Sequence, residues 1–151
     1  MVKRPSAAPE RSAAAVAGDD ARWRALVQRC GNKAARVTPF QRRVYLLCAC
    51  IPRGRVSTYG ALARALHSAP RAVGQALRRN PFAPTVPCHR VVASSLDIGG
   101  FSGETGPGNP TVLKKIALLR AEGVDVTAER VAEACCLHDA SALVKRGTEA
   151  A

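Results

Sequence analysis

Apolar side chains recur at helical spacing between residues 38 and 52, which predicts a core helix with one buried face. Thr38 fits the N-cap position of this helix, Pro39 fits its first turn, and Gln41 can complete a capping box. A Pro-Arg-Gly sequence at residues 52–54 ends the helix. Its apolar positions are Phe40, Val44, Leu47, Cys48 and Ile51.

Two shorter helices are predicted over residues 59–66 and 69–79. Ser57 or Thr58 can cap the first helix, and Ser68 can cap the second. The inward positions are Leu62, Leu66, Ala72, Val73, Ala76 and Leu77, and the outward positions of the second helix include Arg71, Arg78 and Arg79. Such a pair is typical of a helix-turn-helix whose second helix lies on DNA, but an amphipathic pair with a solvated face has the same pattern.

The first 20 residues are rich in Ala, Pro, Ser and Arg and contain almost no large apolar side chain, so we expect them to be disordered. A helical turn around Trp23 is predicted for residues 22–28. Ordered structure is therefore expected mainly after residue 37.

The distribution of charge predicts a polyanionic partner. The chain has 23 Lys and Arg against 11 Asp and Glu, a formal net charge of +12. Residues 38–96 contain nine arginines and no carboxylate. A GC-rich genome would enrich arginine and alanine, but it does not explain the missing acidic residues. Because an ordinary solvated surface mixes both signs and arginine favours forked contacts with phosphate, we expect this stretch to face nucleic acid.

Several classes of protein are excluded by composition. No run approaches the ~20 apolar residues that a membrane helix needs, and the N-terminus lacks the apolar region of a secretory signal. We therefore expect an intracellular protein in a reducing compartment, with its six cysteines as free thiols. The sequence contains no Cys-x-x-Cys pair, so we expect no metal site and no cofactor.

The segment around Cys88 contains the candidate chemistry. A thiol needs an adjacent base or positive charge to become a thiolate at neutral pH, and His89 and Arg90 are candidates for both. Pro87 can fix the exposure of the thiol, and a short strand is predicted at residues 91–93.

These motifs and their spacing resemble the catalytic domain of the O6-alkylguanine-DNA alkyltransferases, also called methylated-DNA--protein-cysteine methyltransferases. The resemblance covers residues 38–126. Its motifs are Thr38-Pro39-Phe40-Gln41, Val56-Ser57-Thr58-Tyr59, Arg71-Ala72-Val73-Gly74-Gln75-Ala76-Leu77, Asn80-Pro81, Pro87-Cys88-His89-Arg90-Val91-Val92 and Leu118-Leu119-Arg120-Ala121-Glu122-Gly123.

The resemblance implies a catalytic role for five residues. Cys88 corresponds to the acceptor that takes the alkyl group from guanine O6 and keeps it as a thioether. His89 corresponds to the residue that removes the thiol proton through a water, and Glu122 to the carboxylate that orients this histidine. Asn80 corresponds to the hinge residue that ties the helix to the active-site turn. Tyr59 corresponds to the phenol that donates toward guanine N3.

The resemblance also implies contacts with the lesion and with DNA. Ser102, Arg90 and Val92 correspond to substrate-binding positions, with Ser102 near O6. Arg71 corresponds to the finger that fills the gap left by a flipped nucleotide. The other implied DNA contacts are Ala72, Gly74, Arg78 and Arg79.

The resulting expectation is a mostly α fold with a short β element, built around a helix-turn-helix. A basic, disordered tail over residues 1–37 precedes a catalytic domain at 38–126, and an extension at 127–151 has no assigned counterpart. The first 37 residues are too few and too polar for the α/β domain that usually precedes the catalytic one in this family. The segment between Ser102 and Leu113 is longer than usual, which puts the wall of the alkyl pocket in doubt.

The implied activity is single-turnover repair of O6-alkylguanine, and of O4-alkylthymine, in double-stranded DNA. We expect a monomer that is nuclear in a eukaryote and cytoplasmic otherwise. One alternative is an alkyltransferase-like protein that binds the lesion without repairing it, although there the cysteine is commonly replaced by tryptophan. The other is a basic helix-turn-helix binder in which Cys88 is structural.

Overall fold

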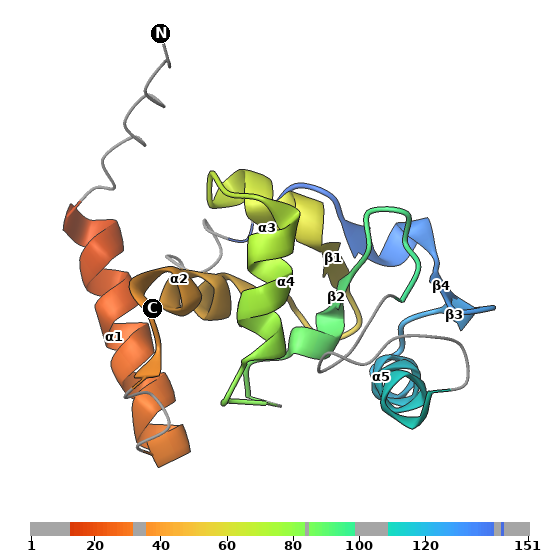
Figure 1. The fold of residues 1–151 in the computed structure, drawn as a ribbon, viewed down its shortest axis with the longest axis horizontal. Helices are drawn as coiled ribbons and strands as arrows, with labels where there is room; N and C mark the ends of the chain where they lie inside the picture. The colour runs from red at the N-terminus through yellow and green to blue at the C-terminus, as the bar shows by residue number, and fades with distance from the viewer. Residues whose placement is uncertain (1–12, 32–35, 84, 99–108, 141–142, 144–151) are drawn as a thin grey trace, which may run out of the picture.

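The computed structural model describes residues 13–31, 36–83, 85–98, 109–140 and 143. The described part is mostly helical with short strands, as predicted (Figure 1). The α-helices are α1 (Ala13–Cys30), α2 (Pro39–Cys48), α3 (Tyr59–Ala65), α4 (Pro70–Arg78) and α5 (Pro110–Ala121). Short 3-10 turns lie at Cys88–Arg90 and Glu133–Cys135. The strands are β1 (Val56–Thr58), β2 (Val91–Val92), β3 (Val126–Thr127), β4 (Arg130–Val131) and β5 (Cys136–Leu137).

The predicted start of α2 is confirmed in detail. The Thr38 hydroxyl accepts a hydrogen bond from the backbone N–H of Gln41 at 3.1 Å, and the Gln41 side chain accepts one from the backbone N–H of Thr38 at 3.0 Å. This reciprocal pair satisfies two donors that a helix start leaves without partners. The helix then buries one continuous set of side chains, Val44, Tyr45, Leu46, Leu47 and Cys48.

The helix-turn-helix pair is formed by α3 and α4, and one predicted cap is wrong. Thr58 caps α3, because its side chain accepts from the backbone N–H of Ala61 at 3.0 Å. Ser68 does not cap α4. Its backbone N–H bonds instead to the carbonyl of Ala63, so Ser68 belongs to the end of α3. The N-cap of α4 is Ala69, and Pro70 starts the helix at a position where no backbone N–H is needed.

A helix occupies part of the segment that was expected to be a disordered tail. The helix α1 spans Ala13–Cys30 and buries Leu26 in the same core as α2, α3 and α4. The Trp23 ring meets Phe82 edge-on, with 5.6 Å between the centroids. The Arg42 guanidinium lies over the same ring and pairs with Asp20. The alanines of α1 favour helix formation. Trp23 and Leu26, which lie about one helical turn apart, then provide the apolar contacts of α1 with the core.

We expect Leu26→Ala to lower the free energy of unfolding by about 2–4 kcal/mol, because it removes a buried side chain at the contact between α1 and α2. Urea unfolding measures this change. The matched control is Leu113→Ala on α5, where the leucine is 49% exposed and the change should be small. Equal stability of the two variants would mean that α1 does not dock as described.

The described residues of the predicted extension, 127–140 and 143, are also part of the fold. The strand β5 pairs in parallel with β1, which lies between β2 and β5 in the three-stranded sheet. Ala140 and Leu143 are buried in the same core cluster as Leu26. Residues on both sides of the expected domain at 38–126 therefore contribute to the packed core, and the domain boundaries themselves stay a prediction.

One sheet joins the strand that leads into α3 to the strand that follows the segment of Cys88. The strands β1 and β2 are parallel, with Ser57 opposite Val91 and Thr58 opposite Val92. Because the two strands run in the same direction, Tyr59 follows β1 at one end of the pair, whereas Cys88–Arg90 precede β2 at the other end. A second core cluster lies between α5 and the antiparallel β3–β4 hairpin, at the opposite end of the molecule from α1 (Figure 1). None of the described helices is long and apolar enough to cross a membrane.

Candidate active site

Cys88 begins a single 3-10 turn that leads into β2. Its backbone N–H donates to the carbonyl of Val86 at 2.9 Å, and the backbone N–H of Arg90 donates to the carbonyl of Pro87 at 2.9 Å. Cys88 as a whole is 9% exposed, so the residue is buried close to the surface. This turn fixes the position of the thiol through backbone hydrogen bonds on both sides.

Asn80 fastens the loop that precedes Cys88 to the end of α4. Its side-chain amide donates to the carbonyl of Val86 at 3.0 Å, and its side-chain oxygen accepts from the backbone N–H of Phe82 at 2.9 Å. The buried Phe82 ring packs edge-on against Tyr45 as well as Trp23. One polar side chain therefore connects the helix of the predicted DNA face to the turn that contains the thiol.

His89 is buried beside Cys88 and is hydrogen-bonded through Nε2 to Glu122. Glu122 is the C-cap of α5, and Gly123 follows it with a φ of 88°, a conformation that favours glycine. Since Nε2 faces the carboxylate, Nδ1 is the ring nitrogen left to accept a proton. Burial lowers the pKa of His89. The hydrogen bond and the negative charge of Glu122 raise this pKa, whereas the positive charges of Arg90 and Lys115 lower it further. The net pKa is below the ordinary value, so the imidazole is neutral at neutral pH.

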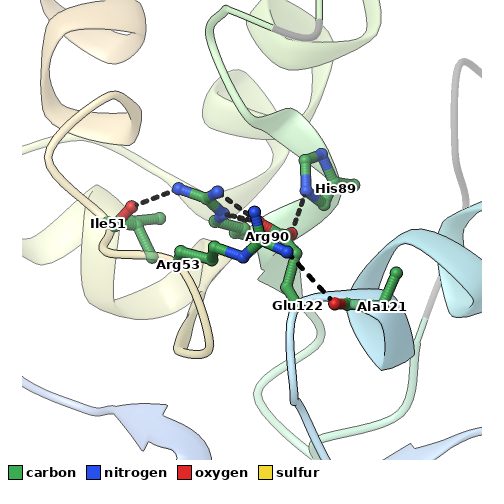
Figure 2. Close-up of polar contacts among 6 residues, drawn as sticks. All are labelled: Ile51, Arg53, His89, Arg90, Ala121 and Glu122. Carbon is green, nitrogen blue, oxygen red and sulfur yellow. Dashed lines mark hydrogen bonds and ion pairs between the residues drawn. The ribbon is translucent and has the colours of Figure 1, made fainter.

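Arg90 binds the same carboxylate. Its Nε donates to Glu122 Oε2 at 2.9 Å, Nη2 donates to the same oxygen, and Nη1 donates to the carbonyl of Ile51 at 2.7 Å (Figure 2). Burial alone would raise the pKa of Glu122, but the hydrogen bonds from Arg90 and His89 outweigh it and hold the pKa below its usual value. Glu122 is therefore ionised at neutral pH.

Tyr59 and Lys115 lie close together near the thiol. Burial raises the pKa of Tyr59 to about 12, with smaller contributions from Cys88 and Cys48, so its phenol is a hydrogen-bond donor at neutral pH. Lys115 Nζ lies 6.0 Å from the Tyr59 ring centroid and donates to the carbonyls of Val91 and Ile98 at 2.7 and 2.8 Å. Burial lowers the pKa of Lys115 to about 8, against the opposing influence of Cys88 and Cys48.

The family model for the DNA-binding domain of 6-O-methylguanine DNA methyltransferase matches residues 39–124. The chain belongs to this family.

Curated relatives of two kinds match the same region. The methylated-DNA--protein-cysteine methyltransferase of Thermococcus gammatolerans is 49% identical over 89 residues, which are 58% of this chain and 47% of the relative. That of Archaeoglobus fulgidus is 45% identical over 89 residues, 59% of each chain. A DNA base-flipping protein of Thermus thermophilus is 44% identical over 87 residues, 58% of this chain and 54% of the relative. The chain spans about half the length of the curated relatives it matches.

Two solved structures have the same fold over the matched region. Mycobacterium tuberculosis OGT in complex with DNA has a TM-score of 0.51 and 38% identity, covering 58% of this chain and 52% of that one. S. pombe Atl1 in complex with damaged DNA containing O6-carboxymethylguanine has a TM-score of 0.50 and 31% identity, covering 61% of this chain and 84% of that one. Both confirm the expected helical fold of the alkyltransferase family.

The exposed face of α4 contains three arginines that are available for a partner. Within the described part of the chain, no hydrogen bond or ion pair engages Arg71, Arg78 or Arg79, and all three are exposed. Ala72 is half-buried beside Arg71. Gly74 is also half-buried, and a Cβ there would lie 4.0 Å from the Tyr59 ring, an ordinary packing distance.

Five of the nine arginines in the acid-free stretch have partners within the protein. Arg42 pairs with Asp20, and Arg90 pairs with Glu122. The other three donate to carbonyls: Arg43 to Leu66, Arg53 to Ala121 and Arg64 to His138. Carbonyls at helix ends lack intrahelical partners, so some of these arginines serve the fold itself.

The sequence-predicted site is largely brought together, with two differences and one omission. Val92 is fully buried in the second core cluster, so its contact with a substrate stays a prediction. Arg90 binds Glu122 and Ile51, and Ser102 lies outside the described residues.

Lys115 is a residue of this site that the sequence analysis missed. It lies within the apolar face of α5, three residues after Val112, and a lysine at such a position is the signal that could have revealed it.

Proposed function

We propose that this chain repairs alkylated DNA by moving the alkyl group from guanine O6, or thymine O4, to the Sγ atom of Cys88. The observation that carries the proposal is the arrangement of three residues. The Cys88 thiol is followed in the chain by His89, and the His89 ring is hydrogen-bonded to the ionised Glu122. Membership of the alkyltransferase family supports the same chemistry. No step in this reaction requires a metal or an organic cofactor.

The neutral His89 is suited to remove the thiol proton, through a water as the family resemblance implies, because Glu122 stabilises the imidazolium that forms. The thiolate attacks the alkyl carbon, the C–S bond forms, and the C–O bond breaks with its electron pair moving onto the base. Tyr59 donates toward guanine N3 as that charge develops, and the leaving base takes up one proton, which balances the proton that His89 removed from the thiol and then releases to water. The thioether has no good leaving group, so each molecule reacts once.

The helix α4 is the part of the chain that would approach DNA. A stacked guanine does not present its O6 carbon substituent in line with a protein thiol, so the nucleotide must leave the helix before transfer. Arg71 lies in the first turn of α4, whereas Arg78 and Arg79 lie at its end. We assign Arg71 to the vacated position in the duplex and the other two to phosphate.

We expect Arg78→Ala to weaken binding about evenly across DNA sequences and to reduce the slope of log affinity against log salt concentration by about 1, because one phosphate contact is lost. Fluorescence anisotropy at several salt concentrations measures this. The matched control is Arg64→Ala, which removes an exposed arginine whose guanidinium already binds the carbonyl of His138. An affinity of the unaltered protein that does not depend on salt would contradict the assigned face.

A second candidate function is binding of the lesion without repair. S. pombe Atl1, whose structure contains damaged DNA, is similar to this chain over 84% of its own length, but the curated methyltransferases are more identical to this chain and do not favour this alternative. Cys88, His89 and Glu122 favour the enzyme, because a binding protein needs neither the thiol nor a base beside it.

A turnover experiment separates the two functions. A limiting amount of protein is incubated with excess duplex containing O6-methylguanine, and the remaining lesion is counted. Repair predicts one lesion removed per protein molecule and no more. A lesion that is bound but remains intact would establish the binding function, and repeated turnover would exclude the thioether mechanism.

A further inference from the structure

The Glu122 carboxylate is shared between two side chains of one short turn. His89 Nε2 bonds to Oε1, whereas Arg90 approaches Oε2 through Nε and Nη2 (Figure 2). The Nε of Arg90 also lies 3.3 Å from Oε1. A forked arginine contact of this kind fixes the plane of a carboxylate, which a single hydrogen bond does not.

Arg90 is itself held by the end of α2. Its Nη1 donates to the carbonyl of Ile51 at 2.7 Å, so the guanidinium connects the α2 terminus to the α5 terminus. The turn that follows α2 also supports the backbone around Glu122. Arg53 Nη2 donates to the carbonyl of Ala121 at 3.2 Å, and a Cβ at Gly54 would lie 3.2 Å from the carbonyl of Glu122. The end of α5 is therefore seated closely against this turn.

We propose that Arg90 is a positioning residue for His89, acting through Glu122, rather than a substrate-binding residue. Its fork holds the carboxylate so that Oε1 faces His89 Nε2, which leaves Nδ1 of the imidazole to receive the thiol proton. All three nitrogens of the guanidinium are engaged by Glu122 and Ile51, so the group is committed within the protein. The role in alkyl transfer rests on the function proposed above, whereas the effect on the histidine does not.

The charges around His89 determine the direction of the expected effect. Glu122 and Lys115 act on the ring from α5, and Arg90 acts from its own turn. Glu122 raises the pKa of His89, whereas Arg90 and Lys115 lower it. Removing Arg90 takes away one positive charge and leaves the ionised carboxylate to His89 alone. The pKa of His89 must then rise, which makes it protonated, and inactive as a base, over a wider pH range.

The decisive variants are Arg90→Gln and Arg90→Lys. NMR titration of the histidine rings, assigned with a His89→Gln variant, is expected to place the His89 midpoint of Arg90→Gln about one pH unit higher than in the unaltered protein. The acid limb of the methyl-transfer rate should move upward by the same amount. Arg90→Lys keeps the charge but not the fork, so its midpoint should stay near the unaltered value while its maximal transfer rate falls.

The matched control is Arg53→Gln, which removes an arginine from the same region whose side chain binds the neighbouring backbone carbonyl and not the carboxylate. Neither its midpoint nor its acid limb should move. An unshifted His89 midpoint in Arg90→Gln would overturn the proposal. If Arg90→Gln does not fold, an Arg90→Lys variant with the full transfer rate would overturn it. Absence of methyl transfer in the unaltered protein would refute the proposed function alone, because the NMR titration still reports on Arg90.

Discussion

Replacing Cys88 by alanine or serine is expected to abolish alkyl transfer completely while duplex binding remains close to that of the unaltered protein. The reaction needs a thiolate next to a base, and neither replacement supplies one at neutral pH. Other cysteines are poor substitutes. Burial raises the pKa of the Cys48 thiol far above its ordinary value and also raises that of Cys136. Transfer of a labelled methyl group from duplex DNA to protein, together with a binding assay, measures both effects.

The control for this prediction is Cys135→Ser, which changes a half-buried thiol outside the site and should leave transfer intact. Methyl transfer that persists in Cys88→Ala would show that another cysteine is the acceptor. Loss of both transfer and binding would require a test of folding, because Cys88 also belongs to the core cluster of α1–α4.

Arg71→Ala is expected to slow repair in duplex DNA by tenfold or more while leaving the reaction with free O6-benzylguanine almost unchanged. Extruding a paired base costs a few kcal/mol, and a side chain that enters the vacancy offsets part of this cost. An offset of about 1.4 kcal/mol corresponds to a tenfold change in rate. The free base needs no extrusion, so the comparison isolates the flipping step. Single-turnover rates with both substrates measure the difference.

The control for charge is Arg71→Lys. It keeps one positive group in the first turn of α4 but loses the planar guanidinium, so an intermediate rate is expected if stacking in the duplex matters. Equal losses on duplex and free base would mean that Arg71 supports the active-site fold, and the finger assignment would be withdrawn.

The elements that could be predicted from the sequence are those that local chemistry determines. The capping box of Thr38 and Gln41 and the cap at Thr58 involve residues three apart, and they form as expected. The docking of α1 could not be predicted in the same way. It depends on Trp23 meeting Phe82, 59 residues away in the chain, and no local pattern reports such a contact.

For the candidate site, too, sequence motifs identified individual residues but not the contacts between residues far apart in the chain. The family motifs pointed to Cys88, His89 and Glu122, and the structure joins the last two by a hydrogen bond. The ion pair between Arg90 and Glu122 could not be predicted from the sequence, because a count of charges treats every arginine as a solvent-exposed side chain. The position of Lys115 on the apolar face of α5 was a signal in the sequence, but the burial of this lysine is explained only once the carbonyls that accept its hydrogen bonds are placed.

The central claim is that Cys88 takes an alkyl group from DNA and keeps it. The most direct measurement is intact-mass analysis of the protein after incubation with a duplex containing O6-methylguanine, followed by mapping of the modified peptide. The account predicts the mass of one added methyl group per molecule, located on Cys88, with unmodified guanine in the DNA. An unmodified protein bound to an intact lesion, or a methyl group on any other residue, would contradict it.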